Sequence, residues 1–307
     1  MTEPVTAAHG AFRDELLSHG LLISMGVDGL YGRSGAFEHV VERLNAAIGA
    51  VGDPDGPEIM RFPPGIGRLQ LAKSGYVRNF PHLAGTVASF SGAEPDHAAL
   101  LGKLSKGEDW TDTQRPTELA LTPAACYGVY PVIASRGRLA ADGALVDVYT
   151  WCFRHEPSID PARMQMFRQR EHVRIGTPQQ VSAFRARWLD RARTLVESFG
   201  LPGVIEVAND PFFGRAGRLL AANQRDDNLK FELLVPIVAG APRTACVSFN
   251  DHRDLFGRAW AIETETGETA HTACVGFGVE RLTLALFRHH GFALASWPGS
   301  VRHALGL

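Results

Sequence analysis

The sequence predicts an α+β fold, in which a mostly antiparallel sheet is flanked by helices packed on one side. Three observations support this prediction. Strand-like runs recur between residues 146 and 278, several of them as pairs joined by a loop. Apolar residues at helical spacing mark helices at Gln179 to Phe199 and at Leu282 to Phe287, and a glycine ends each helix. The 307 residues, 45% of them hydrophobic, can bury a sizeable core.

The composition is that of an ordinary soluble protein. The chain has 31 basic and 33 acidic residues, whereas a protein that grips nucleic acid usually shows a basic excess. No apolar run approaches the roughly 20 residues that cross a bilayer, and the acidic N-terminal stretch is unlike a signal peptide. We therefore expect a cytoplasmic protein. Its four cysteines, Cys126, Cys152, Cys246 and Cys274, are too few for a secreted disulfide framework, which leaves metal binding or burial.

The first 57 residues are expected to form an N-terminal helical extension, and residues 58–307 a single domain. In the extension we predict helices at Ala11 to Leu22 and at Phe37 to Ile48, with the Gly-rich turn MGVDGLYGRSG after the first. The domain begins with a strand, Glu58 to Pro64, and a helix, Leu69 to Tyr76. Thr122 to Val132, which holds Cys126, precedes the strand Val146 to Phe153.

After the helix at Gln179 to Phe199, whose arginines suit a solvated face, the pattern returns to strands. Strands are predicted at Val204 to Ala208, Leu229 to Val235 and Arg243 to Asn250. The insertion at 210–228 has the glycine and aromatic content of a loop, with a brief Arg-bearing helix at Arg215 to Ala222. It could present a surface to a partner, and a purely structural loop is about as consistent with the sequence.

The stretch Trp151 to Ile175 is predicted to form two strands joined by a loop. Strand side chains two residues apart share a face, so we expect Arg154 to point with Glu156, and Phe167 to point with Gln169 and Glu171. With Arg163 in the loop, these groups suit a nucleoside triphosphate: arginines for phosphates, a ring for adenine and a carboxylate for its amino group. A charged surface hairpin, whose Arg and Glu merely pair across strands, is the alternative.

The segment His271 to Gly291 carries a second pattern. A strand-like run meets Gly276-Phe277-Gly278, and Arg281 follows in the first turn of an apolar helix. Glycines let a helix and a ligand approach a sheet closely, and an Arg at the helix start can reach a nucleotide on the sheet. In order and spacing, the two segments resemble motifs 2 and 3 of class II aminoacyl-tRNA synthetases. The strand and helix after Glu58 resemble the motif 1 neighbourhood, which in that family builds the dimer interface.

The resemblance also implies a metal site. Cys126, Glu171 and Cys274 resemble the Cys, Glu and Cys zinc ligands of archaeal seryl-tRNA synthetases, and two thiolates with one carboxylate suit zinc. Three protein ligands leave a fourth position open, which in those enzymes takes the amino group of the amino acid. Strand parity favours Glu171, while His172 is the competing ligand if a bulge shifts the strand. For Cys126, simple burial is the alternative.

The implied reaction is the activation of an amino acid by ATP to an aminoacyl adenylate, with magnesium bridging the phosphates. Arg154 and Arg281 are the expected catalytic residues. The expected ATP-binding residues are Arg154, Glu156, Arg163, Phe167, Lys230, Glu232 and Arg281. Glu171, Ser248 and Asn250 are expected to bind the amino acid substrate. Glu232 is also a candidate substitute for a metal-binding Glu that seryl enzymes carry in the strand TACVSFN and that this strand lacks.

The departures from the seryl enzymes point to another acceptor. The chain shows no large tRNA-binding region before Glu58 and no basic excess, so tRNA is not expected as a partner. This description resembles the amino acid:[carrier protein] ligases, which load the phosphopantetheine thiol of an acidic carrier protein; the arginines of 210–228 then suit docking. We expect a dimeric zinc-dependent ligase for glycine or alanine. A compact seryl-type tRNA synthetase and a non-catalytic amino acid sensor are the alternatives.

Overall fold

A seven-stranded sheet lies at the centre of the computed structural model, which describes residues 3–307. Its strand order is β3-β7-β8-β12-β11-β10-β9, and every neighbouring pair is antiparallel except β3 and β7. The predicted α+β class is confirmed. The strands are β3 (Glu58–Met60), β7 (Ala144–Phe153), β8 (Met166–Gly176), β9 (Val204–Val207), β10 (Lys230–Val235), β11 (Thr244–Arg253) and β12 (His271–Gly278).

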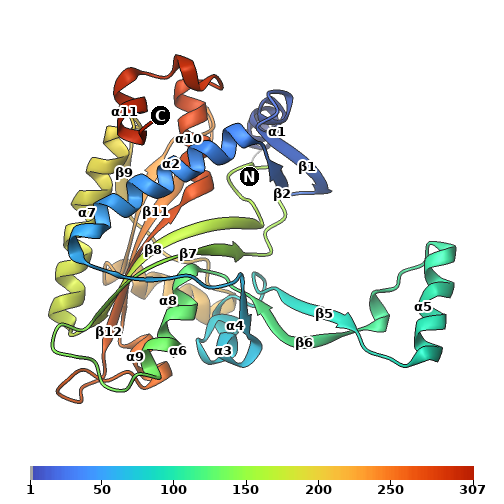
Figure 1. Cartoon of the computed structure of the whole chain (residues 1–307), viewed down its shortest axis with the longest axis horizontal. Coiled ribbons are helices and arrows are strands. Elements are labelled where there is room, and N and C mark those ends of the chain that lie inside the picture. The colour runs from blue at the N-terminus through green and yellow to red at the C-terminus, as the bar shows by residue number, and fades with distance from the viewer. Residues whose placement is uncertain (1–2) are drawn as a thin grey trace.

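Three long helices cover one face of this sheet (Figure 1). They are α2 (Gly35–Gly52), α7 (Pro178–Ser198) and α10 (Val279–His290). Helix α7 starts as its sequence predicts, because Thr177 and Gln180 form a capping box around Pro178 at the first turn. Its apolar stripe, which includes Phe184 and Trp188, joins the largest hydrophobic core with side chains from α2 and α10.

The opposite face is also partly covered, so the expectation of helices on one side only is wrong. A 3-10 turn at Ala125–Gly128 leads into α6 (Val129–Ala134), and α9 (Leu255–Trp260) follows β11. Tyr130 of α6 stacks on Phe256 of α9 with ring centroids 4.3 Å apart. These aromatic groups form a second core against Val146, Val173 and Cys274 of the sheet. The remainder of this face is where the predicted site residues lie.

The N-terminal region departs from its predicted elements. The first helix, α1, spans Glu3–Ser18, and the segment predicted as a Gly-rich turn is a hairpin of β1 (Leu22–Val27) and β2 (Leu30–Arg33). The turn composition belongs to the hairpin tip, where Gly29 has φ +78°. Side chains of α1 and α2 are buried in the same core as α10.

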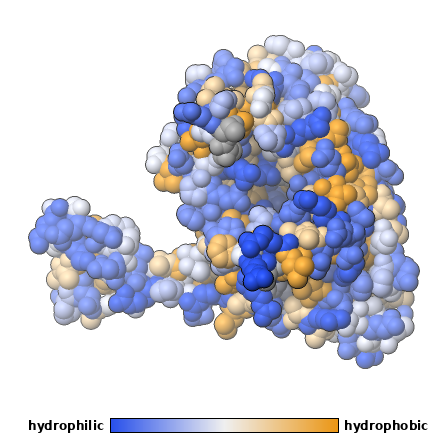
Figure 2. Space-filling view, turned by 180° about the vertical axis from the view of Figure 1, so that it is seen from behind, coloured by the Kyte–Doolittle hydropathy of each residue, from blue (hydrophilic) through white to orange (hydrophobic). Residues whose placement is uncertain are grey.

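Residues 65–121 contain more structure than the single helix that the sequence predicts there. The predicted helix Leu69 to Tyr76 is two short helices, α3 (Arg68–Lys73) and α4 (Tyr76–Asn79), because Gly75 between them has φ +81°. The strands β4 (Gly65–Gly67), β5 (Thr86–Phe90) and β6 (Gln114–Leu121) form a second sheet. Between β5 and β6, helix α5 (Glu94–Lys106) has no buried residue and stands clear of the body as an arm (Figures 1 and 2).

The insertion at 210–228 forms helix α8 (Gly214–Asp226), which is longer than predicted. A short helix, α11 (Gly299–Leu305), ends the chain and packs on α2 and α7. Across residues 3–307, no helix combines the length and the apolarity that crossing a membrane requires.

Candidate active site

The sheet register brings the predicted site residues to the face opposite the long helices. Residues paired across neighbouring antiparallel strands point to the same face. One row across the sheet runs through Glu171, Gly276, Ser248 and Glu232. The next row runs through Cys274, Asn250 and Lys230. Gly276 leaves this face flat, since a β-carbon there would come within 3.2 Å of Ser248 Oγ and 3.3 Å of Glu171 Cγ.

The alternate residues of β8 point the other way, into the helices. Arg168 donates to Glu280 at 2.7 Å and to Glu38 at 2.6 Å, and Arg170 pairs with Asp147. His172 stacks on Trp188 of α7 with ring centroids 4.4 Å apart, and burial lowers its pKa to about 4. His172 is therefore a core residue on the far side of the sheet from the two cysteines and Glu171, as strand parity predicts.

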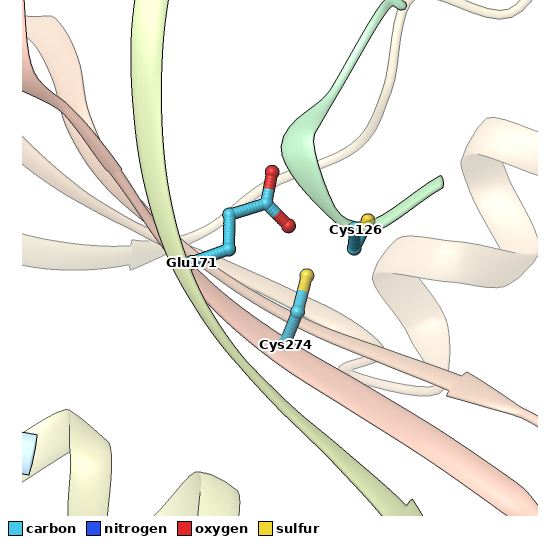
Figure 3. A group of neighbouring side chains, drawn as sticks. All are labelled: Cys126, Glu171 and Cys274. Atoms are coloured by element: carbon cyan, nitrogen blue, oxygen red, sulfur yellow. The ribbon is translucent and has the colours of Figure 1, made fainter. Parts of the chain in front are cut away.

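Cys126, Glu171 and Cys274 come together from three elements and point toward one another (Figure 3). Cys126 lies in the 3-10 turn before α6, Glu171 on β8 and Cys274 on β12. One ligand atom from each residue lies within 4.8 Å of the other two, and all three residues are buried. The other two cysteines, Cys152 and Cys246, are buried, as predicted.

The electrostatics of this cluster suit a divalent cation. Burial raises the pKa of Glu171 to about 8, and the neighbouring Cys274 adds to that shift. The hydrogen bond between the two thiols raises the pKa of Cys126 and lowers that of Cys274. Glu171 Oε1 accepts from the Ala125 amide at 3.0 Å, whereas its buried Oε2 has no hydrogen-bond partner within residues 3–307. Two sulfur atoms and an unpaired carboxylate oxygen are a donor set that zinc fits.

Three arginines surround the neighbouring part of the same face. Arg281 is anchored by the carbonyls of Ala162 and Ala245, at 2.9 Å each, which ties the hairpin loop to β11. Burial lowers the pKa of Arg281, and the charges of Arg154 and Arg163 lower it further. The influence of Arg154 and Arg163 on Arg281 indicates that the three guanidinium groups lie near one another, and such a concentration of positive charge is characteristic of a polyphosphate site.

Arg154 and Glu156 are held differently from the prediction, because they lie in the loop and not on a strand. Strand β7 ends at Phe153, since the amide of His155 bonds to the carbonyl of Leu83 at 3.0 Å and leads the chain away from β8. Arg154 nevertheless lies over the Phe167 ring, 5.4 Å from its centroid, and its Nε donates to Pro123 O at 3.0 Å. Glu156 accepts from Arg163 at 3.2 Å.

Lys230 and Glu232 adjoin the arginines and connect them to the insertion. The Lys230 ammonium contacts Asp210 and lies 3.1 Å from Glu232. Burial opposes the charge on Lys230, but the two carboxylates outweigh it and raise its pKa. Asp210 also accepts from Gln224 of α8 at 2.8 Å. Sequence reasoning missed Asp210 and Gln224, because only folding places the insertion beside β10.

Asn250 and Ser248 border the metal cluster. The Asn250 amide lies 3.4 Å from both Ser248 Oγ and Cys274 Sγ. Sequence reasoning missed His252, whose Nε2 is 3.8 Å from Cys274 Sγ. Its only sequence signal is its position two residues after Asn250 on β11, and a register shift in that strand weakens even this signal.

The comparisons with known proteins agree with this architecture. No protein-family model matches the sequence. Amino acid–[acyl-carrier-protein] ligase 1 of Bradyrhizobium diazoefficiens is 47% identical over 304 residues, which covers 99% of this chain and 93% of that protein. A type-2 serine–tRNA ligase of Methanopyrus kandleri is 29% identical over 194 residues, covering 58% of this chain and 36% of that protein. In three dimensions, M. kandleri SerRS, solved in complex with A. aeolicus tRNASec, superimposes with a TM-score of 0.81 at 21% identity. This superposition covers 96% of this chain and 60% of that one.

Proposed function

Because the chain belongs to the amino acid–[acyl-carrier-protein] ligases, a family of enzymes related to the type-2 serine–tRNA ligases, we propose that it activates an amino acid with ATP and transfers it to a carrier protein. The reaction forms an aminoacyl adenylate and pyrophosphate. The phosphopantetheine thiol of the carrier then attacks the adenylate carbonyl, which forms a thioester and releases AMP. The observation that carries the proposal is the convergence of Cys126, Glu171 and Cys274 on the sheet face that also presents Arg154 and Phe167.

The region around Arg154, Arg163 and Arg281 is proposed to bind ATP. Phe167 offers a ring on which adenine stacks, and Glu156 offers a carboxylate for the adenine amino group. Arg163 is half exposed in the loop and is suited to the γ-phosphate, and Arg281 holds the triphosphate from the start of α10. Magnesium brought with ATP would neutralise part of the phosphate charge, and Glu232 on this face is a carboxylate that could help to hold it.

Arg154 is the residue proposed to accelerate activation. As the amino acid carboxylate attacks, negative charge grows on the α-phosphate. A guanidinium that is already fixed in place stabilises this charge without reorganising, and such stabilisation is commonly the largest catalytic contribution. Arg154 is fixed on one side by Pro123 O and on the other by the Phe167 ring.

The amino acid is proposed to bind at the cysteine cluster. Cys126, Glu171 and Cys274 would hold zinc, and with three protein ligands the ion would have a position for a neutral amine. A hydroxy acid or a fatty acid has no such amine. Ser248 and Asn250 lie beside this position and are suited to contact the rest of the amino acid. We propose glycine or alanine as substrate, because the cluster is buried and its Cys126 and Cys274 are packed in the second core.

Helix α8 is proposed as the docking surface for the carrier protein. It exposes the arginines Arg215 and Arg218 together with Leu219 and Leu220, a combination that complements an acidic amphipathic partner. The Asp210 contact with Lys230 supports this proposal, because it joins the segment before α8 to one of the residues proposed to bind ATP.

A homodimer is proposed through the edge of the sheet. Strand β3 is the outermost strand, paired only with β7 within residues 3–307, and its Ile59 is exposed. An exposed apolar side chain on an unpaired edge is a feature that proteins usually cover.

The test is a labelling experiment. The protein is incubated with labelled glycine, alanine or serine, ATP and magnesium, and with either a holo carrier protein or tRNA. We expect glycine or alanine to be transferred to the carrier thiol. Labelling of tRNA instead would assign the chain to the synthetases, and amino acid binding without pyrophosphate release would make it a sensor.

A further inference from the structure

A β-bulge sits next to the cysteine cluster. Along the pairing of β11 with β12, Asp251 faces Ala273 and Arg253 faces Thr272, so His252 is an extra residue without a paired partner. Arg253 has φ +51°, a left-handed conformation that is strained for an arginine, and its amide donates to Asp251 Oδ1 at 2.8 Å. Bulges re-aim side chains and are common beside functional sites.

The bulge directs the His252 ring toward two polar atoms of β12. Its Nδ1 lies 3.1 Å from Thr272 Oγ1, and its Nε2 lies 3.8 Å from Cys274 Sγ. The ring of Phe256 fixes it from the side, edge to face, with centroids 4.8 Å apart. The group of ligand atoms mutually within 4.8 Å contains Cys126, Glu171 and Cys274 but not His252. The imidazole therefore contacts Cys274 Sγ without being a member of the ligand group.

Thr272 determines which nitrogen of the imidazole carries the hydrogen. Thr272 is 0% exposed, and His252 Nδ1 is the sole hydrogen-bond partner of its hydroxyl in the described chain. A buried hydroxyl that donates to nothing costs about 1–3 kcal/mol, so the hydroxyl donates and Nδ1 accepts. The hydrogen of the neutral ring is then on Nε2, which faces the sulfur.

We propose that Thr272 and His252 form a positioning pair that donates an Nε2–H hydrogen bond to Cys274 and so holds that sulfur for the metal ion. The inference rests on the proposed metal site and adds two residues to it. Asn250 donates to the same sulfur from the neighbouring position on β11, 3.4 Å away. Cys274 therefore receives two N–H groups, and groups of this kind orient a metal ligand and strengthen the site.

Zinc affinity, measured by competition with a chromogenic chelator, tests the proposal. His252→Phe keeps a ring but removes the donor, and we expect zinc to bind about 10- to 100-fold more weakly. His252→Gln places an amide N–H where Nε2 stands, so affinity should stay close to that of the unchanged protein. Thr272→Val should weaken binding less than His252→Phe. The control is Thr283→Val, which removes another fully buried hydroxyl, one that bonds to Val279 O at 2.9 Å.

Nitrogen-15 spectra of the zinc-loaded protein should show the hydrogen of His252 on Nε2. A hydrogen on Nδ1, or unchanged zinc affinity in His252→Phe, would overturn the proposal. An affinity loss in His252→Gln as large as in His252→Phe would also overturn it, because the ring nitrogen would then be a metal ligand. The titration needs no ATP, amino acid or carrier. Failure of carrier loading with zinc binding intact would therefore reject only the proposed function, whereas a chain that binds no zinc would reject the metal site and this pair together.

Discussion

Replacing Arg154 with alanine should cost at least about a hundredfold in amino-acid-dependent pyrophosphate exchange. Its Nε is taken by Pro123 O, and across residues 3–307 its two terminal nitrogens have no hydrogen-bond acceptor, so both can serve the α-phosphate. Hydrogen bonds to charged groups contribute about 1.5–3 kcal/mol each, so two bonds amount to about 3–6 kcal/mol. At about 1.4 kcal/mol per factor of ten in rate, the lower end of this range corresponds to the hundredfold loss.

The assay is exchange of labelled pyrophosphate into ATP at saturating amino acid. The loss of the bond to Pro123 O should lower the free energy of unfolding by about 1.5–3 kcal/mol, which is less than the roughly 5–15 kcal/mol of a typical domain, so the variant should stay folded. Arg154→Lys should also be impaired, because an ammonium cannot bond to the carbonyl and to the phosphate with the geometry of a guanidinium. Arg258→Ala is the matched control, since this arginine pairs with Asp254 on the surface and its side chain is 74% exposed. Exchange near the normal rate in Arg154→Ala would refute the assigned role.

Four further changes test other parts of the structure. Cys274→Ser should lose zinc and amino acid binding together in equilibrium dialysis, and amino acid binding retained without zinc would contradict the proposed site. Arg218→Glu should weaken loading of the carrier while leaving pyrophosphate exchange unchanged; equal loss of both would reject α8 as the docking surface. Arg168→Met leaves Glu280, only 2% exposed, without its main partner, and should cost about 3–5 kcal/mol in urea unfolding. His172 has a pKa of about 4 against an ordinary 6.5, so folding stability should fall as the pH drops through this window. The expected loss is about 3 kcal/mol between about pH 7 and about pH 4, and it should be missing in His172→Phe.

The alternation of side chains along a strand predicts which residues of β8 face the candidate site. The alternation in β8 separates Glu171 from His172, and the structure places these residues on opposite faces. Parity does not apply at Arg154, because β7 ends at Phe153 and the amide of His155 bonds to the carbonyl of Leu83, which is distant in sequence. A pattern read along one segment cannot contain such a contact.

The arm and the bulge show two further limits of the sequence. Helix α5 buries no side chain, so it lacks the strong apolar stripe by which helices are predicted from sequence. His252 sits at a register shift, where the rule that alternate residues share a face no longer holds. Both features depend on what surrounds the segment and not on its own periodicity.

Both faces of β8 carry side chains with specific partners, so the register of this strand in the sheet is strongly constrained. If this strand slipped by one position against its neighbours, Arg168 and Arg170 would turn toward the proposed ATP site. Glu171 would then enter the hydrophobic core beneath α7. No misaligned form could therefore be both well packed and able to bind substrate. Insertions that lengthen β8 should therefore contain an even number of residues. A single inserted residue should abolish both the yield of folded protein and the enzymatic activity.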